Sequence, residues 1–172
     1  MALLSMIAEA DFPPALARAV EQGVATRMLS STLPIRVWAH RPDAAVAWLG
    51  LLDQLHNHGL LDARLRELVR LRIAAYTTCR VCQVARKSDA VSDADVACLS
   101  ADDARFTPAE QAALRYAELF AADPLAIDET TFDALKAHFD TPQIVELNMF
   151  CALMLAGGRM TQAQRAYEET PP

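Results

Sequence analysis

The sequence is poor in glycine, in positive charge and in clustered cysteines. Only five of its 172 residues are glycine, and no stretch sustains the alternation of polar and apolar residues that is typical of β-strands. The formal net charge of −6, without a basic cluster to offset it, argues against nucleic acid as a partner. Four cysteines with a single closely spaced pair do not form the disulfide framework of a small secreted protein.

Long hydrophobic runs and an N-terminal targeting signal are also missing. The longest apolar runs, such as the one that starts at Cys151, are shorter than the about 20 residues that cross a bilayer. The N-terminal segment lacks the positively charged region and the cleavage site of a signal peptide. Hydrophobic residues make up 53% of the chain and charged residues 22%, which is typical of a globular protein with a buried core. We therefore expect a cytoplasmic protein without a membrane partner, folded as a single domain over residues 1–172.

Alanine and leucine are abundant, and the apolar residues follow helical spacing. Proline at a first helical position and side chains suited to N-capping mark where helices begin, and glycine marks two of their ends. The clearest start is Thr107, which forms a capping box with Glu110 and is followed by Pro108. We predict an all-α fold, with helices over residues 42–57, 62–76 and 107–121, a short helix after Ser92, one beginning near Asp128, and one from Thr141 to Gly157-Gly158.

One acidic residue, Glu67, lies on an apolar face of the predicted helix 62–76. It shares that face with Leu71 and Ala74, at helical spacings of four and seven residues. Loss of hydration at such a face would raise the pKa of Glu67 and make it a proton carrier. The alternative is that Glu67 pairs with one of the nearby arginines, which are Arg64, Arg66, Arg70 and Arg72.

Cys79 and Cys82 follow this helix and can open and close a short disulfide. Their spacing puts both on one helical face, within disulfide reach after modest adjustment. A cap at Thr77 or Thr78 would place both thiols in the first turn of a new helix, where the helix dipole stabilises a thiolate. Structural zinc would need four ligands, and a thioredoxin fold would need β-strands beside the pair. Two inert buried cysteines remain an alternative, but a redox dithiol is favoured.

The pattern Glu-x₁₁-Cys-x₂-Cys resembles the alkylhydroperoxidase D (AhpD) core of the carboxymuconolactone decarboxylase superfamily. The segments that begin at Thr107 and Phe132 resemble it too, so that the resemblance covers roughly residues 34–160. It implies an all-α fold of helical hairpins, assembly as trimers or hexamers, no cofactor, and reduction of hydroperoxides. Cys82 would attack the peroxide, Cys79 would resolve it as a disulfide, and an unidentified thiol would reduce that disulfide. Glu67 would supply protons through a relay.

The sequence departs from this family at Arg86. The family motif continues as Cys-x₃-His, and the histidine helps to deprotonate the attacking cysteine, whereas arginine stays protonated and cannot act as a base. If the chain turns near Thr77 and Thr78 and packs back on the preceding helix, residue 86 comes opposite residue 67. We therefore predict a partly buried Glu67–Arg86 ion pair and weak peroxidase activity.

Three functions follow, in order of preference. The first is a peroxidase-like oxidoreductase that uses Cys82 and Cys79, with Glu67 and Arg86 at its site. The second is a redox-sensing or non-catalytic oligomer with an impaired proton relay, and the third is a lyase like the lactone decarboxylases that share the fold. Cys98 and Cys151 match no motif, and we expect Cys151 in the core. The helix over 142–157 is apolar on nearly every side, which favours self-association.

Overall fold

The computed structural model describes residues 2–78 and 85–167. Within these ranges it contains eight α-helices, two short 3₁₀-helices and no strand, which confirms the predicted all-α fold. The cysteine pair, Cys79 and Cys82, lies outside the described residues. The chain divides into two compact units, which we call unit 1 (residues 1–58 and 159–172) and unit 2 (residues 59–158).

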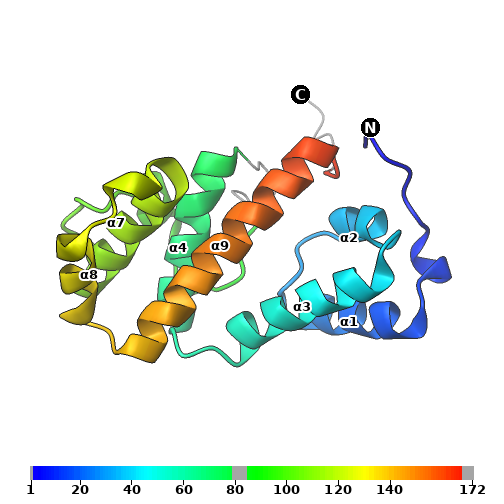
Figure 1. Ribbon diagram of the computed structural model, residues 1–172, viewed down its shortest axis with the longest axis horizontal. Coiled ribbons are helices and arrows are strands. Elements are labelled where there is room, and N and C mark those ends of the chain that lie inside the picture. Colours follow the sequence, from blue (N-terminus) through cyan, green and yellow to red (C-terminus); the bar gives the residue numbers. More distant parts are fainter. Residues whose placement is uncertain (1, 79–84, 168–172) are drawn as a thin grey trace. The chain divides into compact units, whose positions relative to one another are not determined.

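Unit 1 is built around three helices, of which α1 and α2 both pack against α3 (Figure 1). Its core is formed by apolar side chains such as Leu16, Ile35 and Leu49. Each of the three helices starts with proline in its first turn, where the missing N–H costs no hydrogen bond. The prediction of α3 is confirmed at both ends, whereas α1 and α2 were not predicted. The elements are η1 (Glu9–Asp11), α1 (Pro14–Ala25), α2 (Leu33–Trp38), α3 (Pro42–Asn57) and the end of α9.

Unit 2 is organised around α4 (Ala63–Thr77), which packs against α7 (Pro108–Ala122), and α7 in turn contacts α8 (Glu129–Lys136) (Figure 1). Side chains cap the predicted starts: the carboxylate of Asp62 accepts a hydrogen bond from the N–H of Leu65. Ser92, Thr107 and Asp128 form capping boxes at α6 (Asp93–Ala97), α7 and α8. A short 3₁₀-helix, η2 (Pro124–Ala126), separates α7 from α8.

The last helix, α9 (Thr141–Gln164), is longer than predicted. The prediction that it ends at Gly157-Gly158 is wrong, because Gly158 is a packing position rather than a helix end. A Cβ atom at Gly158 would lie 2.8 Å from Oγ1 of Thr77, so only glycine allows this close approach to α4.

The full length of α9 bears on the prediction that no segment is long enough to span a membrane. By length and composition α9 could cross a bilayer, although the apolar run considered in the sequence was too short. The core helix of a globular protein passes the same test, and Leu147, Phe150 and Cys151 of α9 are buried.

Candidate functional site

Glu67 and Arg70 form a buried ion pair on α4. Their exposed fractions are 2% and 4%, and they lie one helical turn apart. Nε and Nη2 of Arg70 donate to the two carboxylate oxygens of Glu67 at 2.7 and 2.8 Å, which is the two-pronged geometry that gives the strongest ionic hydrogen bonds. The alternative that Glu67 pairs with an arginine of its own helix is therefore confirmed.

The charge on Glu67 is stabilised rather than suppressed. Burial raises the pKa of Glu67, but the hydrogen bonds and the charge of Arg70, together with the main-chain N–H of Lys87, outweigh burial, so the pKa lies below its ordinary value. The expectation that the apolar face raises this pKa is thus wrong. At neutral pH Glu67 is a carboxylate that holds other groups in place.

The chain turns after α4 and returns to Glu67, as predicted. Thr78 ends the helix in the left-handed conformation, with φ of 52°. Residues 79–84 lie outside the described part, and the chain reappears against α4: the carbonyl of Ala85 accepts from Nη2 of Arg70 at 2.6 Å, and the N–H of Lys87 donates to Oε1 of Glu67 at 3.0 Å. The ion pair therefore holds the chain that follows the cysteine-bearing segment against α4.

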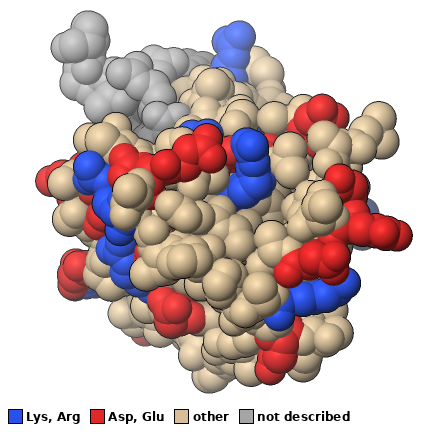
Figure 2. Space-filling model, turned by 90° about the vertical axis from the view of Figure 1, so that its left-hand side faces the viewer, with Lys and Arg blue, Asp and Glu red and all other residues tan. Residues whose placement is uncertain are grey.

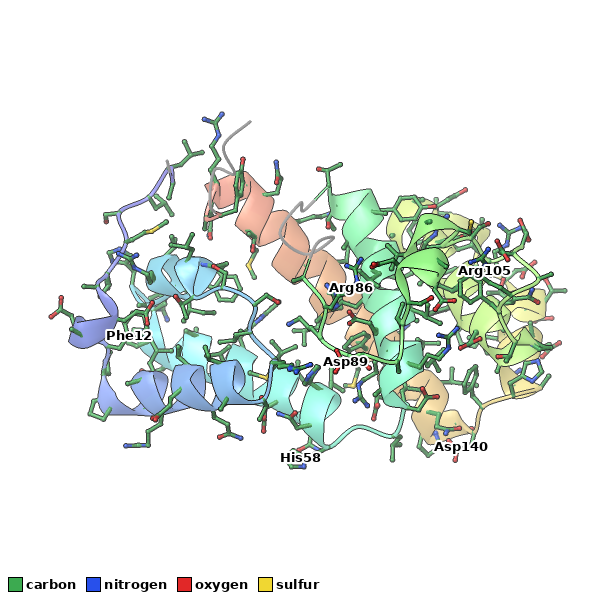
Figure 3. All side chains as sticks on the ribbon, turned by 180° about the vertical axis from the view of Figure 1, so that it is seen from behind. Phe12, His58, Arg86, Asp89, Arg105 and Asp140 are labelled. Carbon is green, nitrogen blue, oxygen red and sulfur yellow. The ribbon has the colours of Figure 1, made fainter. Side chains whose placement is uncertain are left out.

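Arg86 is not the partner of Glu67, which corrects the predicted ion pair. Its Nη2 lies 3.4 Å from Oδ1 of Asp93, and Figure 3 shows Arg86 and Asp89 on the loop that follows α4. The reason is local competition: Arg70 already occupies both oxygens of Glu67 from the same helix, and the further contact from the returning chain comes from its main chain.

Lys87 is the residue of this site that the sequence analysis missed. Burial and the charge of Arg70 lower the pKa of Lys87 to about 8, against a smaller opposite effect of Glu67. A lysine with this pKa can exchange a proton close to neutral pH. Its place next to Arg86, on a segment expected to return to Glu67, was a signal in the sequence that could have identified it.

Two other arginines of α4, Arg64 and Arg72, connect this helix to the rest of unit 2. Arg64 bridges Asp95 at 3.1 Å and Glu110 at 2.7 Å, and Arg72 pairs with Glu118 at 2.8 Å. Figure 2 shows acidic and basic side chains interleaved on the face of the protein that includes α7 and α8. These pairs fix the orientation of α4 relative to α6 and α7.

The two cysteines of the described residues differ in environment. Cys151 is buried in α9, as expected, and burial raises the pKa of its thiol, which makes it unreactive. Cys98 is exposed. Among residues 2–78 and 85–167, no group of three His, Cys, Asp or Glu side chains has the geometry to hold a metal ion.

The carboxymuconolactone decarboxylase family model matches residues 42–119, a span that includes Glu67, the cysteine pair and Arg86. An AhpD-core protein from Ralstonia eutropha, described as an uncharacterized peroxidase-related protein, superimposes with a TM-score of 0.75 at 21% identity, over 98% of this chain and 92% of that one. Residues 42–119 of this chain therefore match the carboxymuconolactone decarboxylase family, and the chain shares the fold of an AhpD-core protein. The debrominase Bmp8 has the same fold, with a TM-score of 0.78 at 20% identity, over 97% of this chain and 92% of that one.

Two proteins similar in sequence to this chain are described as uncharacterized. A Mycobacterium tuberculosis protein is 32% identical over 148 residues, which are 80% of this chain and 51% of that protein. The chain thus spans about half the length of that relative. The Escherichia coli protein YnjA is 28% identical over 142 residues, which are 76% of this chain and 75% of YnjA.

Proposed function

We propose that the protein is a thiol oxidoreductase that reduces hydroperoxides through Cys79 and Cys82. The strongest support is the buried Glu67–Arg70 pair and its hydrogen bonds to the returning chain at Ala85 and Lys87. Cys82 precedes Ala85 by three residues, a span of at most about 11 Å. A charged cluster is therefore attached to the segment that carries the thiols.

In the first step the thiolate of Cys82 attacks the terminal oxygen of the hydroperoxide. An S–O bond forms, the O–O bond breaks, and the alkoxide that leaves takes up a proton to become an alcohol. Cys79 then attacks the sulfenic acid of Cys82, which forms the disulfide and releases water. An external thiol reductant returns the disulfide to two thiols, so that each turnover consumes one hydroperoxide and two reducing equivalents.

Lys87 is the proposed donor of the proton that the alkoxide needs. Its pKa of about 8 keeps the amine protonated at neutral pH while leaving it a sufficiently strong acid. Glu67 takes the role of a positioning residue, because its carboxylate holds Arg70 and the main chain of Lys87. The cations Arg70 and Lys87 also favour a thiolate over a thiol nearby.

The second candidate function is a redox sensor with slow turnover, and the ionised state of Glu67 favours it. An ionised carboxylate locked to Arg70 cannot feed protons to the thiols, so the dithiol would oxidise readily but turn over slowly. Such a protein would act as a redox sensor rather than as an efficient peroxidase.

The dithiol assignment is tested with hydroperoxide and mass spectrometry. Fully reduced protein is mixed with one equivalent of hydrogen peroxide, and we expect a Cys79–Cys82 disulfide in the parent protein. The variant Cys79→Ser should accumulate sulfenic acid at Cys82, and the matched variant Cys98→Ser should behave like the parent. Oxidation confined to Cys98 or Cys151, or no link between Cys79 and Cys82, would overturn the proposal.

Two further substrates separate peroxide reduction from other chemistry on this fold. A fold relative, the debrominase, has been crystallised as a cysteine-to-alanine variant with 2,3,4-tribromopyrrole. That compound and a carboxymuconolactone are each incubated with the reduced protein under the conditions of the hydrogen peroxide experiment. Faster loss of bromide or of carbon dioxide than of peroxide would assign the protein to debromination or to the lyase function.

We also propose that the protein assembles with copies of itself, as a trimer or a multiple of a trimer. On α9, one face is apolar yet exposed, with exposed fractions of 50% for Val145 and 51% for Met149, and it continues through Ala152 and Ala156. Sedimentation velocity at micromolar concentration should show the oligomer, and Met149→Glu should weaken it. Leu125→Glu, at an exposed position outside α9, is the control, and a parent protein that sediments as a monomer would refute the assembly.

A further inference from the structure

Unit 1 contains a pocket whose lining includes none of the described residues assigned above to the thiol chemistry. Its volume is about 570 Å³, within the range of about 300–1,000 Å³ that small-molecule sites occupy. The walls of the pocket are formed by the N-terminal arm (Leu4 and Ser5), the end of α2, the start of α3 and the last turns of α9. All of its lining residues belong to unit 1.

Two tryptophans give the pocket an aromatic wall. The rings of Trp38 and Trp48 meet edge to face, with centroids 5.7 Å apart and planes inclined by 67°. Nε1 of Trp38 donates to Oε1 of Gln164 at 3.0 Å, which orients the indole. Most of the remaining lining is aliphatic, including Met160. A planar apolar molecule fits such a wall, because aromatic rings prefer edge-to-face and offset contacts with other rings.

The pocket has a cationic side chain, Arg41, and no acidic residue is found among the described residues that line it. Its other polar lining residues are Ser5, His40 and Gln164. Nε2 of His40 lies 3.0 Å from the carbonyl oxygen of Ser5, so this ring nitrogen is the donor and holds the imidazole to the arm. The guanidinium of Arg41 offers the planar, two-pronged donor pattern that matches carboxylate and sulfonate oxygens.

We propose that this pocket binds a small aromatic molecule with one anionic group, its ring against Trp38 and Trp48 and its anion on Arg41. The proposal does not involve Cys79 or Cys82, so it is tested separately from the proposed peroxidase function.

The experiment uses the tryptophans as the reporter, because Trp38 and Trp48 are the only two in the chain. The probe is 8-anilinonaphthalene-1-sulfonate, and its neutral counterpart without the sulfonate is N-phenyl-1-naphthylamine. We expect saturable quenching of tryptophan fluorescence with one probe bound per chain. The affinity for the sulfonate should be about tenfold higher than for the neutral compound, because one charge-assisted hydrogen bond adds a binding free energy of that size.

Four variants locate the site. Arg41→Gln should cost about tenfold in affinity for the sulfonate and leave the neutral compound unaffected, whereas Arg18→Gln, at an exposed arginine on α1, should change neither. Ala44→Phe, which fills the pocket from its exposed rim, should abolish binding of both compounds. The double variant Cys79→Ser/Cys82→Ser should bind like the parent.

The outcomes decide the proposal because far-ultraviolet circular dichroism checks that each variant is folded. Equal affinity for the two probes, or an Arg41→Gln variant that binds the sulfonate like the parent, would refute the anion site. Full binding by a folded Ala44→Phe variant would place the probe elsewhere and overturn the pocket assignment altogether.

Discussion

The two units treat charged and polar side chains differently. Among residues 2–78 and 85–167, five of the six buried polar or charged residues belong to unit 2, and they include Glu67, Arg70, Glu110 and Glu118, whereas the sixth, Thr161, lies in unit 1. Unit 1 packs an apolar core and keeps its charges at the surface, as ordinary stability requires. Buried charge carries a desolvation penalty that partners must offset, so its concentration around α4 points to a role other than stability.

The units also begin their helices differently. In unit 2 the side chains of Asp62, Ser92, Thr107 and Asp128 accept hydrogen bonds from the first turns of α4, α6, α7 and α8. In unit 1, helices α1 to α3 have proline in their first turn and have no side-chain cap. Unit 2 therefore depends on specific polar contacts at its helix starts as well as in its interior, and the predictions below test that dependence.

The largest effect should come from breaking the buried ion pair. Arg70→Met leaves the carboxylate of Glu67 buried without its partner, and we expect a loss of about 3–5 kcal/mol in the free energy of unfolding. Urea denaturation at pH 7 measures it. Removing both charges with Glu67→Leu/Arg70→Met should recover most of the loss, and Arg18→Met in unit 1 should cost less than about 0.5 kcal/mol. An Arg70→Met variant as stable as the parent would contradict a buried, ionised Glu67.

The next effect concerns Lys87 and the rate of peroxide reduction. Lys87→Met should slow turnover about a hundredfold at pH 7, within the range for loss of a general acid. Because the pKa of Lys87 is about 8, the parent rate should lose this contribution as the pH rises through 8, and Lys87→Arg, which keeps the charge but not the acidity, should be as slow as Lys87→Met.

The control for Lys87 is the chain's other lysine, Lys136, which is exposed on α8. Lys136→Met should leave the pH–rate profile unchanged. Parent-like activity in Lys87→Arg would show that the charge matters and the proton does not, which would remove Lys87 from the proposed proton transfer.

A smaller effect should appear in acid. The folded state holds the pKa of Glu67 below its ordinary value of 4.5, so the ion pair stabilises the protein above that pH and the contribution is lost as the pH falls through the lower, folded-state pKa. Unfolding by urea between pH 7 and pH 3 should therefore show declining stability, and Glu67→Gln should flatten part of that decline. Glu129→Gln, at an exposed position of α8, should leave the slope as it is.

The smallest effect concerns the helix caps. Thr107→Ala removes the side chain that accepts from the N–H of Glu110, and we expect a loss of about 1 kcal/mol. Arg41→Ala, at the N-cap of α3 where no side-chain cap exists, should cost less. Equal losses would show that the two units do not differ in how their helix starts are stabilised.

The sequence alone determined the elements whose signals are local. Capping residues at Asp62, Ser92, Thr107 and Asp128 act on amide groups within three residues, so the starts of α4, α6, α7 and α8 could be predicted. The turn near Thr78 and the return of the chain to Glu67 could also be anticipated, because a continuous helix would carry residue 86 far from residue 67.

Tertiary structure decided which contacts form and how they set the chemistry. Several arginines of α4 lie near Glu67 in the sequence, and the fold selected Arg70 as its partner. Burial raises the pKa of Glu67, but the contacts with Arg70 and the main chain of Lys87 outweigh burial and lower it. Gly158 continues α9 because Thr77 approaches it, a contact between residues more than eighty positions apart. The pocket of unit 1 joins the N-terminal arm to the end of α9. Such contacts depend on distant segments meeting, and no local pattern of residues encodes them.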